Sequence, residues 1–139
     1  MVGRFASVGT IMVVVLSCGS GACFGGERCP GVSMSEVRSL GKLPSALRKQ
    51  LPGSESGLDG IADRDARFNA TDVVTPNVPT RRFTLAAVGA TCAVIAVERG
   101  GIARWFEVTE YRLSGATWNP VGKLAIRQEP RSTADLLSN

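Results

Sequence analysis

Histidine is absent from this 139-residue chain. The absence removes the commonest general base, the commonest metal ligand, and every Ser–His or Cys–His nucleophile pair. Aromatic residues make up only 6% of the chain, and the basic residues behind its net charge of +4 are scattered among acidic ones. Nucleic-acid-binding proteins instead gather basic residues on one face and interleave stacking aromatics. The composition argues against nucleic-acid binding and lowers the expectation of an enzyme, and we predict neither a cofactor nor a metal site.

Long apolar runs are confined to the N-terminus. Residues 8–16 are uncharged and mostly apolar, with Arg4 before them and a stretch rich in glycine and serine after them. A basic start, a short apolar core and a small-residue exit are the three parts of a secretory signal. The apolar core is shorter than the about 20 residues that cross a membrane. We therefore predict a cleavable signal segment at residues 1–22 and an exported protein, held in the periplasm or at the cell envelope.

Two cysteines near the end of this segment are candidates for lipidation. Cys18 follows the apolar core directly, and Cys23 follows Ser-Gly-Ala. Both contexts resemble the bacterial lipobox over four residues, although neither has Leu three positions before the cysteine together with Ala or Gly just ahead of it. Cleavage after Ala22 by an ordinary signal peptidase fits the small residues as well. A lipid-anchored form and a soluble form both stay open.

The number of cysteines predicts a disulfide. Export leads to an oxidising compartment, where thiols pair. If Cys23 carried the lipid, Cys29 and Cys92 would remain as one pair. We predict the bond Cys29–Cys92, and the alternative is a local Cys23–Cys29 loop.

The chain length allows one domain. We predict a linker at 23–33, a single α+β domain at 34–129 and a flexible polar tail at 130–139. Ser33 stands three residues before Glu36, as in a capping box, and apolar residues then recur at helical spacing up to residue 51. Gly41 and Pro44 divide this stretch into two short helices, 34–41 and 44–51.

The second half of the chain has β character. Residues 52–79 form a long connection with little periodicity. Alternating or continuous apolar residues then predict an antiparallel meander of about four strands, with glycine turns at 100–101 and 114–115. A bulge near Thr109 and Glu110 would bring the apolar residues of the third strand to one side. The two helices are expected to pack on one face of this sheet.

The acidic stretch at 59–72 offers oxygen ligands without a complete metal motif. Asp63 and Asp65 begin like a calcium-binding loop, but Arg67 occupies the third ligand position and the required glycine is missing. We expect these carboxylates to make local turns and to pair with neighbouring arginines.

Other polar residues suggest two further candidate sites. Asn69 begins Asn-Ala-Thr, a glycosylation acceptor that has meaning only in a eukaryotic host. Glu98, Glu107 and Glu110 could supply a carboxylate pair for acid–base chemistry, although strand residues of this kind are usually exposed to solvent.

The strongest candidate for a contact surface lies around Trp105. Arg104, Tyr111 and Arg112 are close in sequence, and Trp, Tyr and Arg dominate interface hot spots. We predict these four residues as partner-binding residues, with packing of Trp105 against the long connection as the alternative.

These observations rank three functions. The first is a small exported binding module that acts by contact with a protein partner in the envelope, in the manner of an inhibitor or immunity protein. The second is a lipid-anchored structural or assembly factor in weak contact with an anionic membrane surface. The third is a hydrolase that uses carboxylates alone.

Overall fold

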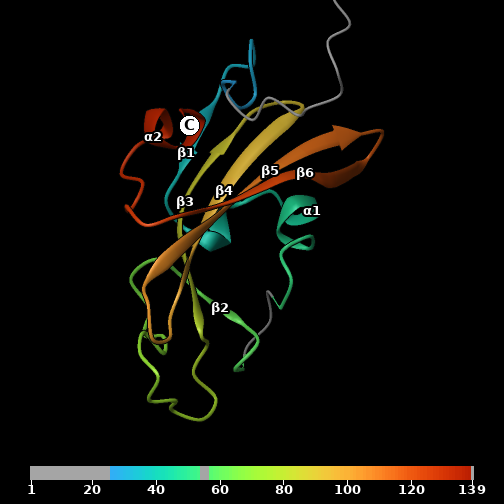
Figure 1. Ribbon diagram of the computed structural model, residues 1–139. Coiled ribbons are helices and arrows are strands. Elements are labelled where there is room, and N and C mark those ends of the chain that lie inside the picture. The colour runs from blue at the N-terminus through green and yellow to red at the C-terminus, as the bar shows by residue number, and fades with distance from the viewer. Residues whose placement is uncertain (1–25, 54–56, 139) are drawn as a thin grey trace, which may run out of the picture.

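The computed structural model describes residues 26–53 and 57–138 (Figure 1). The predicted signal segment, with Cys18 and Cys23, lies outside the described residues. In chain order the elements are β1 (Ser35–Val37), the 3-10 turn η1 (Leu40–Lys42), α1 (Ser45–Arg48), β2 (Ile61–Ala62), β3 (Arg81–Val88), β4 (Cys92–Arg99), β5 (Trp105–Ser114), β6 (Thr117–Ile126) and α2 (Thr133–Leu137).

A six-stranded sheet contains most of the described residues that belong to helices or strands. Its strands follow the order β1-β3-β4-β5-β6, and β2 pairs with the start of β3. The β2–β3 pair is parallel, whereas the other pairs are antiparallel. Gly101 and Gly115 adopt positive φ where β4 turns into β5 and β5 into β6, a conformation that glycine reaches without steric cost.

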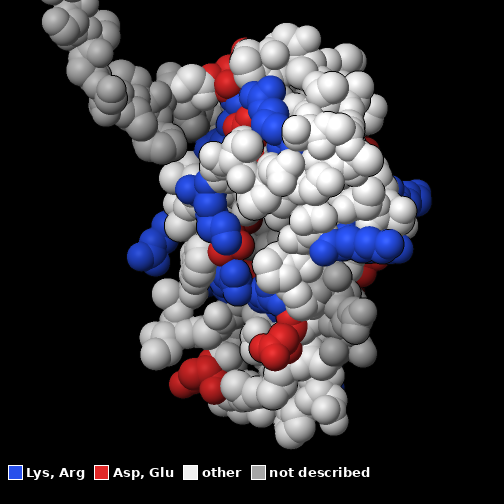
Figure 2. All heavy atoms as spheres, turned by 90° about the vertical axis from the view of Figure 1, so that its right-hand side faces the viewer, with Lys and Arg blue, Asp and Glu red and all other residues white. Residues whose placement is uncertain are grey.

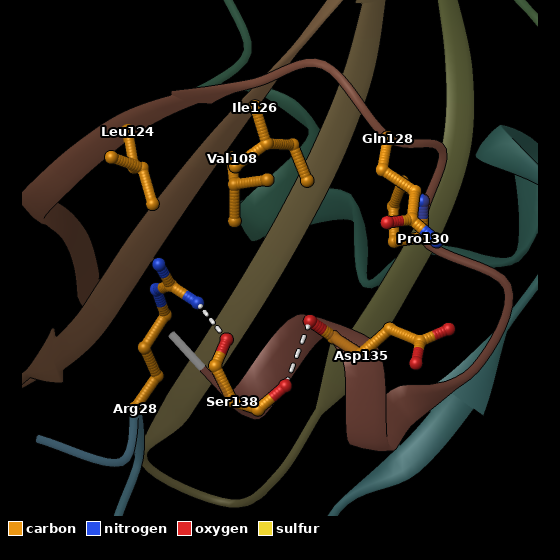
Figure 3. A pocket seen from close by; sticks show the side chains of 8 residues that line it. All are labelled: Arg28, Val108, Leu124, Ile126, Gln128, Pro130, Asp135 and Ser138. Carbon is orange, nitrogen blue, oxygen red and sulfur yellow. Dashed lines mark hydrogen bonds between the residues drawn. The ribbon is translucent and has the colours of Figure 1, made fainter.

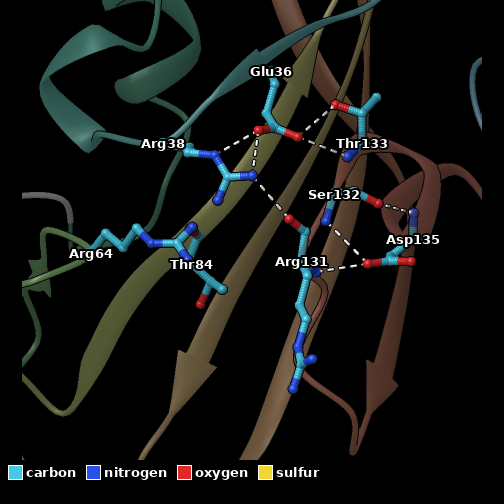
Figure 4. A network of polar contacts seen from close by, with 8 residues as sticks. All are labelled: Glu36, Arg38, Arg64, Thr84, Arg131, Ser132, Thr133 and Asp135. Atoms are coloured by element: carbon cyan, nitrogen blue, oxygen red, sulfur yellow. Dashed lines mark hydrogen bonds and ion pairs between the residues drawn. The ribbon is translucent and has the colours of Figure 1, made fainter.

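The predicted α+β class is wrong, because the molecule is mostly this sheet, with two short helices and one 3-10 turn. The predicted helix 34–41 contains β1, in which Glu36 stands opposite Ala87 of β3. Figure 4 shows that the Glu36 carboxylate binds Arg38 and the first residue of α2, Thr133, and does not cap a helix at 34–41. Pairing with a distant strand therefore overrides the local helical pattern. The predicted helix 44–51 is reduced to the four residues of α1.

The sheet is covered on both faces. α1 and α2 lie on opposite sides of it (Figure 1). On the side of α1, which we name the α1 face, four leucines of the segment 40–51 pack on residues of β3 to β6, including Phe83, Ile95, Tyr111 and Trp118. The opposite side, the α2 face, is built from smaller side chains and includes Cys29, Leu85, Ala87, Cys92, Val94, Ala96, Val108 and Leu136. None of the helices within 26–53 and 57–138 is long and apolar enough to cross a membrane.

The segment 130–139, predicted to be a flexible tail, contains the ordered helix α2. Ser132 and Asp135 form a reciprocal capping box at its start, which satisfies backbone N–H groups that would otherwise lack partners. Leu136 is completely buried on the α2 face. Arg28 holds the end of the helix, since its backbone N–H binds the Leu137 carbonyl and its side chain binds two further carbonyls.

Two strands carry bulges. In β3 the extra residue is Thr84, since Phe83 and Leu85 stand opposite the consecutive residues 97 and 96 of β4. In β6 the extra residue is Val121, which has no partner in β5. The bulge predicted near Thr109 and Glu110 of β5 is therefore in β6. Because β5 stays regular, its apolar residues serve both covered faces: Val108 lies on the α2 face and Tyr111 on the α1 face.

Candidate functional site

The predicted Cys29–Cys92 disulfide is confirmed. The two Cα atoms are 5.7 Å apart, and both residues are almost fully buried. The bond ties the segment before β1 to the first residue of β4. Among the described residues, the one group of possible metal ligands is this pair with Glu110. Both sulfurs are bonded to each other, so the group acts as a covalent tie between two parts of the fold.

The four predicted partner-binding residues do not come together. Trp105 and Tyr111 lie on the α1 face, opposite Arg99 and Ala93 of β4. Arg104 and Arg112 instead form ion pairs with glutamates of the α2 face. Tyr111 is only 3% exposed, so it belongs to the core. Alternation along a regular β5 separates the residues that sequence proximity had grouped.

The three candidate carboxylates are also separated. Glu107 lies on the α1 face, whereas Glu98 and Glu110 lie on the α2 face, where Glu110 stands opposite Val94, four residues along β4 from Glu98. Each accepts hydrogen bonds from at least one arginine. Burial raises the pKa of Glu107, but the hydrogen bond and charge of Arg99, together with Lys123, lower it more, and the net result is below the ordinary value. These carboxylates serve as ion-pair partners.

Asp63 organises the fold in place of a metal. Its carboxylate accepts hydrogen bonds from the backbone N–H groups of Leu40 and Arg64, both at 2.7 Å, and from the Ser39 hydroxyl at 2.8 Å. Burial raises the pKa of Asp63, but these hydrogen bonds lower it by more, and the net pKa is below the ordinary value. The carboxylate thereby fixes the start of η1 against the chain that follows β2.

Asn69 is unsuited to carry a glycan in the folded protein. Only 5% of it is exposed. Its side-chain amide donates to the Thr75 and Val78 carbonyls and accepts from the Thr75 N–H. The residue holds the connection before β3 in shape.

A pocket on the α1 face is the strongest candidate site. We name it the Arg81 pocket. It has a volume of about 120 Å³ and lies between the segment 50–52 and strands β2 to β6. Leu51, Ile61, Ile95, Val97, Tyr111 and Pro120 supply apolar walls, and Arg81, Glu107 and Lys123 supply charge.

Arg81 is a buried cation that has no ion-pair partner among the described residues. It is 8% exposed, and its guanidinium donates to the carbonyl oxygen of Asp59. It forms no ion pair within the described part of the chain. Burial and the neighbouring Arg99 lower the pKa of Arg81, against the opposing charges of Glu107 and Asp59. Both leading causes penalise the charged form, so a further negative charge would stabilise it.

The surroundings of Arg81 have a surplus of positive charge. Arg99 stands directly opposite Arg81 in the sheet. Glu107 binds Arg99 at 2.9 Å and Lys123 at 3.2 Å, so its carboxylate is already shared between two cations other than Arg81. The Nε of Arg99 is buried and lacks a hydrogen-bond partner among the described residues. Figure 2 looks onto the side that carries α1 and shows basic side chains in a broken column, with acidic side chains between them and a wide uncharged area beside them.

Gly53 leaves room for the contact between the Arg81 guanidinium and the Asp59 carbonyl. It adopts a φ of +64°, and a side chain there would overlap the Asp59 carbonyl and the Arg81 guanidinium. Sequence reasoning missed the pocket, because Arg81 looked like one of many scattered cations. The available signal was the pair Arg81-Arg82 at the start of a strand, since alternation must direct one of the two toward each covered face.

The α2 face has two further hollows. One, of about 240 Å³, lies between α2 and strands β5 and β6 (Figure 3). The other, of about 140 Å³, adjoins the bulge at Thr84. The Thr84 hydroxyl is buried and unpartnered within residues 26–53 and 57–138, while Arg64 binds its carbonyl at 2.9 Å. Acidic and basic side chains line this second hollow together, so it has no clear charge preference.

Comparisons of the chain with models of protein families, with curated proteins and with solved structures find no match. The functional argument therefore rests on the geometry of the molecule itself.

Proposed function

We propose that this protein is a small binding module that acts by contact, and that its Arg81 pocket receives a carboxylate presented by an acidic protein partner. The observation that carries the proposal is the buried Arg81 guanidinium, which has no ion-pair partner among the described residues. Buried charges in proteins are normally paired, because an isolated one is costly to desolvate. A carboxylate entering the pocket would supply the missing charge and accept strong hydrogen bonds.

The wider setting of this module is part of the same proposal. The disulfide agrees with an oxidising compartment and supports an exported protein of the inhibitor or immunity type, with its partner in the envelope. A lipid on Cys18 or Cys23 would hold the module at a membrane surface. A hydrolase of the third kind would need two of its own carboxyl groups to reach the same substrate. The separation of Glu107, Glu98 and Glu110 along the sheet therefore favours a binding function.

A peptide pair tests the proposal directly. The probes are acetyl-Gly-Glu-Gly-amide and its glutamine counterpart, titrated into the full chain and followed by NMR. We expect the glutamate peptide to shift the amide signals of Arg81, Arg99 and Lys123, with an effect that added salt weakens. Equal shifts with the glutamine peptide would contradict the proposal.

Two lysine variants provide a matched control. Lys123→Gln removes a cation that lines the pocket and should weaken binding of the glutamate peptide several-fold. Lys42→Gln removes an exposed cation of η1, away from the lining residues. It should leave binding unchanged, whereas an equal loss in both variants would indicate only general charge attraction.

A further inference from the structure

The hollow between α2 and strands β5 and β6, which we name the α2 pocket, points to a second ligand. We propose that it binds a small carboxylate with an apolar tail, such as a medium-chain fatty acid. The α2 pocket is on the opposite side of the sheet from the Arg81 pocket, so this proposal is independent of the proposed function.

The floor of the α2 pocket is apolar and partly open to solvent. Val108 of β5 and Leu124 and Ile126 of β6 form it, and in Figure 3 their side chains lie along one side of the hollow. Leu124 is 42% exposed, so much of its apolar surface is in contact with water. An acyl chain that covered this floor would remove apolar surface from water.

One cation stands beside this apolar floor. In Figure 3 the Arg28 side chain extends from the far side of the hollow toward Leu124 and Val108. Its Nη1 donates to the carbonyls of Leu136, at 2.8 Å, and Ser138, at 2.9 Å. Nε and Nη2 make no bond to any other described residue, and Arg28 has no ion pair there. These two groups are free to donate side by side to a carboxylate.

Arg28 is held ready for such a ligand. Its backbone N–H binds the Leu137 carbonyl at 3.1 Å, and the next residue, Cys29, is fixed by the disulfide. A side chain anchored in this way loses little freedom when a ligand binds.

The acidic residue of the α2 pocket does not repel an anion bound at the floor. Asp135 also lines it, but its carboxylate accepts the backbone N–H groups of Arg131 and Ser132. In Figure 3 this carboxylate points away from the apolar side chains, whereas Arg28 reaches toward them. The charge that faces the floor is therefore positive.

The volume limits the size of the ligand. At about 240 Å³ the α2 pocket is below the range of about 300–1,000 Å³ that is typical for drug-sized molecules. It suits one short acyl chain, with the carboxylate at Arg28 and the tail along β6.

A chain-length series tests the proposal by calorimetry on the full chain. The probes are butanoate, hexanoate and octanoate, with octan-1-ol as the uncharged counterpart. Burial of each added methylene should tighten binding about fourfold. Octanol, which lacks the charge that Arg28 would bind, should bind at least tenfold more weakly than octanoate, as about 1.5–3 kcal/mol for a hydrogen bond to a charged group implies. No binding at millimolar concentrations, no dependence on chain length, or equal binding of octanol would each overturn the proposal.

Variants locate the ligand. Arg28→Gln should lower octanoate binding to the level of octanol and leave octanol binding unchanged. Because Arg28 also holds α2, a second test uses two exposed apolar residues of β6. Leu124→Ser, in the floor of the α2 pocket, should weaken the binding of octanoate several-fold. Val121 is 56% exposed and does not line the pocket, so Val121→Ser should leave the binding of octanoate unchanged. Equal losses in these two variants would place the ligand elsewhere and overturn the proposal.

Discussion

The two faces of the sheet are closed in different ways. On the α1 face, four leucines from residues 40–51 cover the strands without a covalent bond. On the α2 face, the cover is a five-residue helix with a single fully buried leucine, and the strands beneath it present alanines and a cysteine. The disulfide is on this second face. Where the helix buries little apolar surface, the disulfide fixes the segment at Cys29, and the neighbouring Arg28 holds the end of α2 by hydrogen bonds.

The Arg81 pocket and the α2 pocket also differ, in the balance of charged and apolar side chains that line them. The Arg81 pocket has one buried cation with two further cations close by, so a ligand at Arg81 meets charge in surroundings of low polarity, where electrostatic interactions are strong. The α2 pocket has an apolar floor and one anchored arginine. The first pocket is suited to a carboxylate on a larger partner, and the second to a small amphiphile.

Removal of the disulfide should produce the largest loss of stability. The bond spans 63 residues, which on the chain-entropy model corresponds to at most about 4 kcal/mol. In the double variant Cys29→Ala, Cys92→Ala, denaturant unfolding should show this loss, and added reductant should lower the stability no further. Hydrogen exchange should accelerate in α2 more than on the α1 face. Equal acceleration on both faces would contradict the proposed division of roles.

Truncation of a leucine on each face compares the two covers directly. Leu47 and Leu136 are both completely buried. Leu47→Ala should cost about 3 kcal/mol, within the usual range for such a cavity. Leu136→Ala should cost less than half as much, because α2 can open locally while the disulfide retains the segment at Cys29. Equal losses in chemical denaturation would show that α2 unfolds only with the whole molecule.

Loss of the Asp63 charge should weaken the α1 face moderately. Asp63→Asn retains the shape of the side chain but reduces its capacity to accept three hydrogen bonds. We expect a loss of about 1–2 kcal/mol, as for hydrogen bonds to charged groups near the surface. Asp65→Asn alters an exposed neighbour and should change stability by less than about 0.5 kcal/mol. Similar losses in both variants would remove the structural role of Asp63.

The smallest effect should be a pH dependence due to Glu107. Its pKa in the folded protein is below the ordinary value of 4.5, so its contribution is fully present above about pH 4.5 and disappears as the pH falls further. The free energy of unfolding of wild type, relative to that of Glu107→Gln, should therefore decrease as the pH falls below about 4.5, by about 1 kcal/mol or less. Glu27→Gln, at an exposed position, should leave the slope unchanged. A difference between wild type and Glu107→Gln that does not vary with pH would show that Arg99 and Lys123 do not influence the ionisation of Glu107.

The sequence predicted which leucines are buried better than it predicted their backbone. Leu40, Leu43, Leu47 and Leu51 are all in the core, as their spacing indicated, yet they belong to a 3-10 turn, a single helical turn and the chain beyond it. Gly41 and Pro44 keep these pieces short, and no isolated helix of this length is stable without packing. The spacing of the leucines thus predicts which side chains are buried, while the length of each segment and its tertiary contacts decide the backbone conformation.

Non-local contacts explain most of what sequence reasoning missed. The capping spacing of Ser33 and Glu36 was overridden by strand pairing, and the capping box that does form, at Ser132 and Asp135, precedes a helix of only five residues. The surplus charge around Arg81 depends on which strands become neighbours. The cysteine pair, in contrast, followed from parity and compartment alone.

The contact between Arg28 and α2 has a consequence for the order in which the protein acquires its structure during synthesis. The segment around residue 28 binds backbone groups of residues 136–138, which a ribosome adds more than 100 residues later. Much of the α1 face needs only residues 40–99 and can assemble while the chain is still growing. The α2 face must wait for residues 133–137, so until then its strands, and Cys92 among them, are accessible to chaperones and to thiol oxidants.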